Sequence, residues 1–168
     1  MPSRREARRA ISGSGRVSGR CGSTVFALDH HRGSEEHQPG EMFHDPDLYD
    51  SQYAVVDTFR AFRHNIESAG MSDRVIPLVT TSERAAAHWT TPLGMVFIDG
   101  GHSLDAALTD YRCWSGRIVR GGILAIHDVY ENAAEGGQAP RAIYQMALDS
   151  GLYELQGRAD SLALLLKR

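Results

Sequence analysis

The chain has no long apolar run and only two cysteines among its 168 residues. A helix that spans a membrane needs about 20 consecutive apolar residues, so we expect a protein that neither crosses nor binds a membrane. Cys21 and Cys113 provide no disulfide framework and match no metal-binding spacing. A low cysteine content is typical of a reducing compartment, and we therefore expect a cytoplasmic protein.

Positive charge is concentrated in the first 20 residues, which hold six arginines and one glutamate and so carry a net +5. The whole chain carries −3, which leaves −8 for the remaining residues. An acidic body disfavours a broad nucleic-acid surface, so no nucleic-acid partner is expected. The basic segment lacks the apolar stretch of a secretory signal. We expect a solvated, disordered tail, with an organelle transit peptide or a nucleic-acid-binding arm as alternatives.

The most informative segment is MVFIDGGH at residues 95–102. A short apolar run followed by turn residues predicts a buried strand, and ligands bind beyond the carboxyl ends of the strands in a parallel sheet. Asp99 and His102 follow this strand directly. A second segment of the same design, GILAIHD at residues 122–128, ends in Asp128. Two strands that each end in Asp and His predict one shared site.

The rest of the chain alternates strand and helix patterns, which predicts an α/β fold with a doubly wound, mostly parallel sheet and an antiparallel end. We expect a tail at residues 1–22 and one domain at residues 23–168. Strands are expected at 23–28, 74–79, 94–98 and 123–126, helices at 53–69, 82–89, 103–119 and 140–150, and a closing strand pair at 153–156 and 161–166. Pro77 lacks an N–H group for a ladder, so its strand is expected at an edge.

Helix ends are also marked in the sequence. Ser82 and Ser103 are expected to cap the amino ends of the helices that follow them, because a serine hydroxyl accepts the first free N–H groups. Pro140 is suited to the first turn of the last helix. The glycine pair at residues 121–122 is expected to end the helix that begins near Ser103.

The segments FIDGGH at 97–102 and RGGILAIHD at 120–128, with the helix between them and the closing hairpin, resemble class I S-adenosylmethionine-dependent methyltransferases. The most similar subgroup methylates small molecules and has Asp-Gly-Gly-His after its fourth strand. The segment from Asp29 to Gly40 is similar to a bacterial branch of that subgroup. The resemblance covers residues 23–168 and implies a Rossmann-like sheet with strand order 3-2-1-4-5-7-6.

The chain departs from this family at its beginning. The glycines at residues 13–19 look like the family's cofactor loop, but no apolar strand precedes them and three residues separate them from the strand at 23–28. We therefore expect an N-terminally truncated fold without the first strand and Gly-rich loop. Without the loop that binds the methionine part of the cofactor, we expect poor cofactor binding. Without the first strand, two inner strand edges would be exposed, so we expect association into a homo-oligomer through the sheet.

The resemblance implies two contacts to S-adenosylmethionine. Asp29, at the end of the strand at 23–28, stands where a carboxylate binds both ribose hydroxyls. Ser82 stands near the adenine, through its hydroxyl or its main chain. The alternatives are a turn-capping aspartate and a simple helix cap.

Asp99 has several interpretations: it binds the cofactor, it orients or deprotonates the acceptor hydroxyl, or it binds Mg²⁺ together with Asp128. Some relatives in the resembled subgroup hold a metal at matching strand ends. Capping of the next helix is the alternative. His102 is a base, a metal ligand or a structural hydrogen-bonding group. His127 is predicted to point away from Asp128, because successive strand residues face opposite sides.

Two loops are expected near the site. Residues 30–50 follow a strand end and contain four of the eight histidines, with six carboxylates. This loop is interpreted as a substrate-facing lid, a metal cluster or a plain solvated loop. Residues 136–140 are expected to border the substrate.

Three functions remain open. The first is transfer of a methyl group from S-adenosylmethionine to an oxygen or nitrogen of a small-molecule acceptor. The second is a non-catalytic remnant of the fold. The third is a metal-dependent hydrolase that activates water with Asp99 and Asp128.

Overall fold

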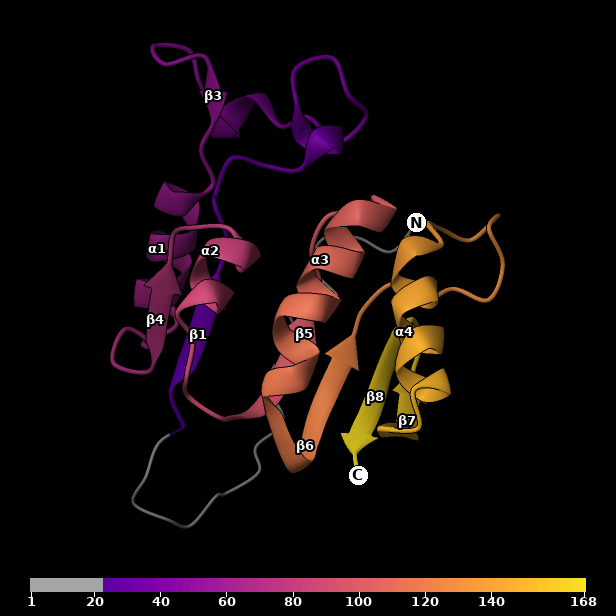
Figure 1. Ribbon diagram of the computed structural model, residues 1–168. Helices are drawn as coiled ribbons and strands as arrows, with labels where there is room; N and C mark the ends of the chain where they lie inside the picture. Colours follow the sequence, from indigo (N-terminus) through magenta and orange to yellow (C-terminus); the bar gives the residue numbers. More distant parts are fainter. Residues whose placement is uncertain (1–22) are drawn as a thin grey trace.

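The computed structural model describes residues 23–168, so the expectations for residues 1–22, including those for the glycines at 13–19, lie outside the described residues. The described chain is a mixed α/β structure (Figure 1). Within it, no helix combines the length and the apolar character needed to span a bilayer.

Two parallel strand pairs dominate the structure. β1 (Val25–Leu28) pairs with β4 (Val75–Leu78), and β5 (Leu93–Ile98) pairs with β6 (Ile118–Ile126). The second pair continues antiparallel into β8 (Leu162–Lys167) and then β7 (Tyr153–Ala159). The resulting orders β1-β4 and β5-β6-β8-β7 agree with the predicted doubly wound fold and its antiparallel hairpin.

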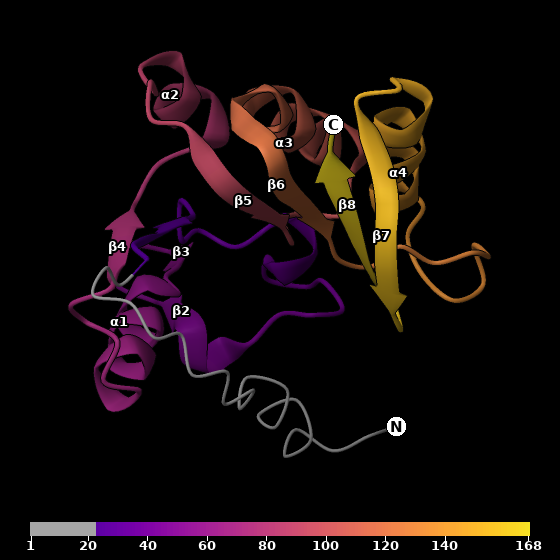
Figure 2. The ribbon, with the colours of Figure 1, turned by 90° about the horizontal axis from the view of Figure 1, so that it is seen from below.

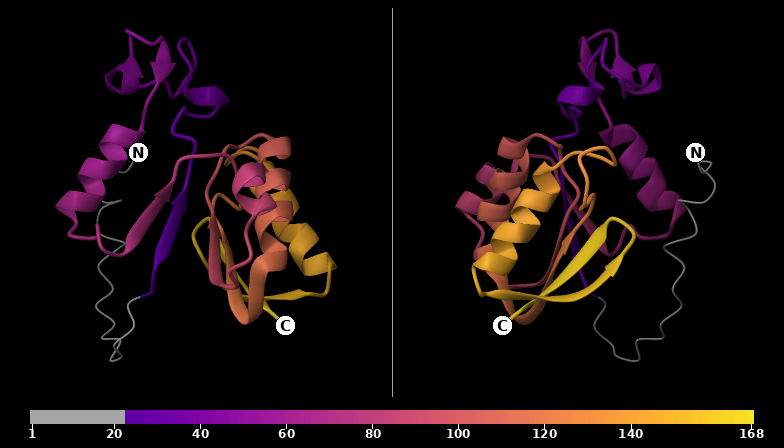
Figure 3. Two further views of the ribbon diagram at one scale, coloured as in Figure 1. Left: turned by 60° about the vertical axis from the view of Figure 1, so that its left-hand side comes forward. Right: turned by 90° about the vertical axis from the view of Figure 1, so that its right-hand side faces the viewer.

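The helices lie on both sides of the strands. Figures 2 and 3 show α2 (Ser82–Ala87), α3 (Leu104–Trp114) and α4 (Ala139–Asp149) together on one side of the larger sheet. α1 (Phe59–Ser68) lies apart from them, beside β1 and β4. A small antiparallel pair, β2 (Tyr49–Asp50) and β3 (Val55–Val56), lies before α1.

The main core lies between the larger sheet and helices α3 and α4. Its fully buried large side chains are Leu124, Ile126, Val129, Ile143 and Leu165. Leu124 and Ile126 stand at alternate positions of β6, which place both side chains on one face of the sheet. Leu165 comes from β8, Ile143 from α4 and Val129 from the segment after β6.

Among residues 23–168, no strand pairs with the second edge of β1 or of β5. Aromatic side chains cross this position instead. Trp89 packs edge-on against Phe26 of β1, with ring centroids 4.8 Å apart, and against Trp114 of α3 at 5.4 Å. The Arg117 guanidinium donates hydrogen bonds to the carbonyl oxygens of Ala86, at 2.6 Å, and Trp89. These contacts join α2 to α3.

Several local predictions are confirmed. The strand containing Pro77 lies at an edge, because β4 pairs with β1 alone. The Ser103 Oγ accepts a hydrogen bond from the Ala106 N–H at 3.3 Å and so caps α3. Pro140 lies in the first turn of α4, as expected from its fixed φ angle.

Three local predictions are wrong. The helix expected from residue 53 begins at Phe59, because residues 49–56 form β2, a turn and β3. Thr81, rather than Ser82, occupies the N-cap of α2. The glycine pair at 121–122 lies inside β6, because α3 ends at Trp114 and a short 3-10 turn leads into the strand.

The joint between α2 and α3 gives a stability prediction. Arg117→Ala removes hydrogen bonds to the carbonyls of Ala86, Trp89 and Cys113. We expect the free energy of unfolding to fall by about 1–3 kcal/mol, the scale for hydrogen bonds from a charged donor. Arg112→Ala, at an exposed position of α3, is the control, with an expected change below about 0.5 kcal/mol. Urea unfolding followed by tryptophan fluorescence measures both, and equal losses would contradict the role given to Arg117.

Asp110 on α3 gives a prediction on pH. Burial raises the pKa of Asp110, and the hydrogen bond from Ser82 opposes this without reversing it. Proton uptake therefore favours the folded state, and this stabilisation grows as the pH falls through the raised folded-state pKa. We expect the free energy of unfolding of the wild type to rise relative to that of Asp110→Asn between about pH 7 and about pH 4. Asp105→Asn, from the exposed start of α3, is the control; parallel pH curves for the wild type and Asp110→Asn would overturn this expectation.

Candidate functional site

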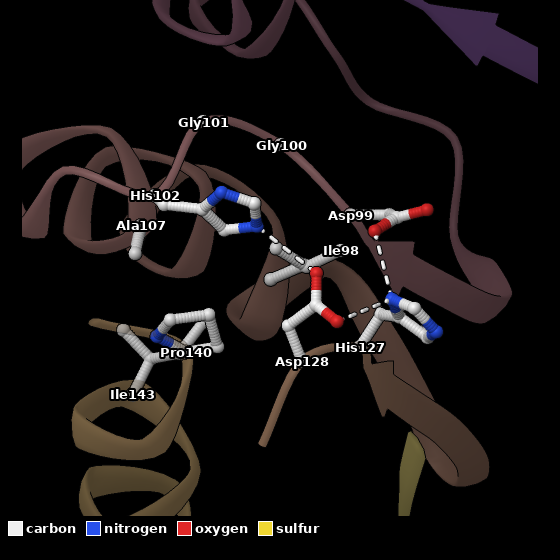
Figure 4. Close-up of a pocket in the computed structure, with 10 residues that line it drawn as sticks. All are labelled: Ile98, Asp99, Gly100, Gly101, His102, Ala107, His127, Asp128, Pro140 and Ile143. Atoms are coloured by element: carbon white, nitrogen blue, oxygen red, sulfur yellow. Dashed lines mark hydrogen bonds and ion pairs between the residues drawn. The ribbon is translucent and has the colours of Figure 1, made fainter. Parts of the chain in front are cut away.

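The candidate site lies where β5 and β6 end. Ile98 and Ile126 are paired across the two strands, and the His127 N–H donates to the Ile98 carbonyl at 3.0 Å. The residues that follow, Asp99 and Asp128, therefore leave the sheet side by side (Figure 4). The structure thus brings together the two strand ends that carry Asp and His, as the sequence predicted.

Asp99, His127 and Asp128 form a compact cluster. The His127 Nδ1 lies 3.2 Å from the Asp99 Oδ1 and 3.1 Å from the Asp128 Oδ1. One potential ligand atom from each residue lies within 4.8 Å of the others. The His127 Nδ1 is buried and makes no hydrogen bond of acceptable geometry, despite these short distances. A buried nitrogen between two carboxylates is a donor set that fits a divalent cation.

The prediction that His127 points away from Asp128 is wrong. It assumed that the alternation of strand side chains continues to residue 128. β6 ends at Ile126, and Asp128 has a φ of 56°, in the left-handed region. This backbone turn brings the Asp128 carboxylate to the same side as the His127 ring.

His102 lies between two carboxylates. Its Nε2 is 2.9 Å from the Asp128 Oδ2, and its Nδ1 is 3.1 Å from the Glu36 Oε1. Partial burial opposes a charge on this ring, but the hydrogen bond to Asp128 and the charges of Glu36 and Asp128 outweigh it, so the pKa of His102 is raised. A ring that donates from both nitrogens has no lone pair for a substrate proton. In this arrangement Asp99 is the better placed base.

Asp128 is held in its ionised form. Burial alone would raise its pKa, but hydrogen bonds from His102 and from the Tyr130 hydroxyl, with the nearby His127 ring, lower it instead. The Tyr130 hydroxyl donates to the Asp128 Oδ1 at 3.0 Å. The carboxylate is therefore fixed through both oxygens.

Glu36 was missed by the sequence analysis as a site residue. It lies in a 3-10 turn, Glu35–His37, within the loop after β1, and the Ser34 hydroxyl donates to its carboxylate at 3.3 Å. The same loop lies against the chain after β5, since a Cβ added to Gly101 would lie 3.4 Å from the Ser34 Cβ. No spacing distinguishes Glu36 from its neighbour Glu35, so the sequence carried no signal for this contact.

The loop at residues 30–50 forms no metal cluster of its own in the described chain. The group of Asp99, His127 and Asp128 is the set of three or more compatible ligands found across residues 23–168. The loop instead brings the Glu36 carboxylate to His102, and its interpretation as a substrate-facing lid stays a prediction.

The main chain at Gly100 lies directly against Asp110 of α3. A Cβ added to Gly100 would lie 2.6 Å from the Asp110 Oδ2, so a larger residue there would require the Asp110 side chain to move. Asp110 in turn accepts a hydrogen bond from the Ser82 hydroxyl. The Asp-Gly-Gly-His segment therefore rests directly on α3, which fixes the direction in which Asp99 leaves the sheet.

The loop before α4 borders the site, as predicted. Pro140 lines the hollow that contains Asp99, His102 and Asp128 (Figure 4). A Cβ added to Gly137 would lie 3.6 Å from the His102 Cβ.

Asp29 and Ser82, the two residues expected to bind the cofactor, lie in different surroundings. The Asp29 N–H continues the β1–β4 ladder by donating to the Leu78 carbonyl at 3.2 Å, and its carboxylate is half exposed. Ser82 is buried, and its hydroxyl donates to Asp110 and accepts from the Trp114 Nε1 at 3.0 Å. An adenine contact by Ser82 therefore remains a prediction for its main chain rather than for its hydroxyl.

Solved structures share this fold at low sequence identity. The O-methyltransferase NovP aligns with a TM-score of 0.59 at 12% identity, covering 86% of this chain and 60% of NovP. The methyltransferase PaMTH1 from Podospora anserina, bound to SAH, gives 0.56 at 13% identity, covering 87% of this chain and 72% of PaMTH1. An rRNA methylase from Streptococcus thermophilus gives 0.51 at 14% identity, covering 86% and 73%.

The sequence itself matches a family model. Residues 9–129, well over half of the chain, match the family described as a methyltransferase domain. The structural likeness shows that the fold is the Rossmann-like fold of methyltransferases. The chain belongs to the methyltransferase-domain family.

Proposed function

We propose that this chain transfers a methyl group from S-adenosylmethionine to an oxygen or nitrogen of a small molecule. One observation carries the proposal: in a member of the methyltransferase-domain family, an accessible Asp29 and the cluster around Asp99 and Asp128 all follow parallel strands at their carboxyl ends. Ligands of such sheets bind at these ends. We place residues 23–168 in this functional unit, and the Asp-Gly-Gly-His segment favours the small-molecule subgroup.

The residues at the end of β1 fit the cofactor. The Asp29 Oδ1 accepts a hydrogen bond from the His31 N–H at 2.7 Å, while among residues 23–168 the Oδ2 has no closer partner than the His31 Nδ1 at 3.8 Å. A half-exposed carboxylate with a free oxygen is suited to the two hydroxyls of a ribose. We propose that Asp29 binds the ribose and that the main chain at Ser82 lies near the adenine.

S-adenosylmethionine, when bound, supplies the methyl group. The chain then has to orient the acceptor and take its proton, since methyl transfer depends mainly on alignment. Asp99 is the half-exposed member of the cluster and is our candidate for this role. Glu36 and Asp128 hold His102 in place beside it.

The acceptor is proposed to be a small molecule because of a second hollow next to the site. A cavity of about 350 Å³, within the range of small-molecule sites, lies beside Tyr130, whose hydroxyl contacts Asp128. Its lining carries three carboxylates, Glu131, Glu135 and Asp160, and one guanidinium, Arg158, which pairs with Glu131. The lining therefore keeps a net negative charge, which disfavours a nucleic-acid backbone, so we favour a neutral or amine-bearing acceptor over RNA.

We also propose that Asp99, His127 and Asp128 bind a divalent cation. The buried, unpaired His127 Nδ1 between two carboxylates supports this. Mg²⁺ prefers oxygen ligands, whereas an imidazole nitrogen suits Mn²⁺ or another transition metal better. In the methyltransferase such an ion would hold the acceptor oxygen; in the alternative hydrolase it would activate water.

The ribose contact is tested with Asp29→Ala. We expect the affinity for S-adenosylmethionine, measured by calorimetry, to weaken by about 1–3 kcal/mol, the scale of a lost hydrogen bond to a charged group. Asp73→Ala, an exposed carboxylate before β4, is the control and should bind as the wild type does. Unchanged affinity in Asp29→Ala would remove this residue from the site. Absence of binding by the wild type at millimolar cofactor would favour the non-catalytic remnant.

The cation site is tested with Mn²⁺, whose binding is followed by electron paramagnetic resonance. We expect His127→Ala and Asp128→Asn each to weaken Mn²⁺ binding by about tenfold or more, because each removes one ligand. His88→Ala, an exposed histidine beside α2, should not. Mn²⁺ should also bind more tightly than Mg²⁺ to the wild type. Equal Mn²⁺ affinity in His127→Ala and the wild type would exclude His127 as a ligand.

A further inference from the structure

His31 is a buried histidine in the loop directly after β1, and only 5% of its surface is exposed. Its ring packs against Phe59 and Phe62 of α1, with centroids 5.0 Å and 5.2 Å away. The Nε2 is buried and has no hydrogen-bond partner in the described part of the chain. An apolar side chain would fill the same space without burying an unpaired nitrogen. The role of a histidine at this position is therefore expected to lie with its other ring nitrogen, Nδ1.

That other nitrogen contacts Thr58. The His31 Nδ1 and the Thr58 Oγ1 lie 2.8 Å apart, and the Thr58 N–H donates to the His31 carbonyl at 3.3 Å. Thr58 occupies the N-cap of α1, where a threonine hydroxyl ordinarily accepts from the helix. Here it makes no such bond, and Asp57 accepts from the Phe59 N–H instead, at 2.9 Å. The Thr58 hydroxyl therefore contacts the His31 ring instead of capping α1.

The same histidine sets the conformation next to Asp29. His31 has a φ of 57°, a left-handed conformation that histidine tolerates better than most residues. In this conformation the His31 N–H points back to the Asp29 Oδ1 at 2.7 Å. The Thr58 contacts hold the His31 ring and carbonyl, and so they hold the turn that directs the Asp29 carboxylate.

We propose that His31 is a positioning residue for ribose recognition: anchored on Thr58, it fixes the Asp29 carboxylate in the direction that binds the ribose hydroxyls. The inference rests on the proposed function of Asp29 as the ribose-binding group. It adds a second residue pair, His31 and Thr58, that sets specificity without touching the cofactor.

The test compares two probes, S-adenosylhomocysteine and its 2′-deoxyribose analogue, by calorimetry. Their affinity ratio reports the ribose contact, and a general loss of stability leaves it unchanged. We expect a ratio of about tenfold or more for the wild type. Thr58→Val, which keeps the shape and removes the hydroxyl, should lower this ratio several-fold, and Thr58→Ser should restore it.

A second variant, His31→Asn, keeps the proposal testable if Thr58→Val does not fold. His31→Asn tolerates the left-handed backbone and loses the anchored ring, so its ratio should fall in the same way. If the wild type discriminates the two probes and both variants keep the full ratio, His31 is not a positioning residue, while the role of Asp29 stands. If the wild type binds neither probe, or both equally, the ribose-binding role of Asp29 fails and the inference fails with it.

Discussion

The guanidinium of Arg117 joins two parts of the structure that share no ladder hydrogen bond among the described residues. It donates to the carbonyl of Ala86 in the last turn of α2 and to the carbonyl of Trp89 just after that helix. Trp89 then packs between Phe26 of β1 and Trp114 of α3. The position of the β1–β4 pair relative to the larger sheet thus depends on side chains. The proposed ribose-binding group follows β1 and the proposed acceptor-binding groups follow β5 and β6. Their relative position therefore depends on the same side-chain contacts.

Strands β1, β4 and β5 were predictable because each is a short apolar run bounded by turn residues. The edge position of β4 followed from Pro77, and the start of α3 followed from Ser103, since both effects are local. The start of α1 and the end of α3 were not predictable in this way. β2 and β3 form through pairing between residues 49–50 and 55–56. β6 continues through the glycine pair at 121–122, where its register against β5 shifts.

The candidate site was predictable as far as the strand ends determine it. Asp99, His102 and Asp128 meet because the carboxyl ends of parallel neighbours share an edge. His127 was misjudged because a single left-handed residue, Asp128, breaks the alternation. Glu36 was missed because its contact with His102 joins residues 66 positions apart, and such contacts leave no trace in local spacing.

Asp128 connects the cluster to the loop after β1. One oxygen accepts from Tyr130 and lies beside His127, while the other contacts His102, which contacts Glu36 in turn. A ligand that draws the Asp128 carboxylate toward His127 would therefore change the hydrogen bond between Asp128 and His102. Because Glu36 belongs to the loop that begins at Asp29, that change reaches the segment proposed to hold the ribose. Polar contacts thus join the cluster to Glu36, and the main chain of the loop joins Glu36 to Asp29, separately from the aromatic contacts of Trp89.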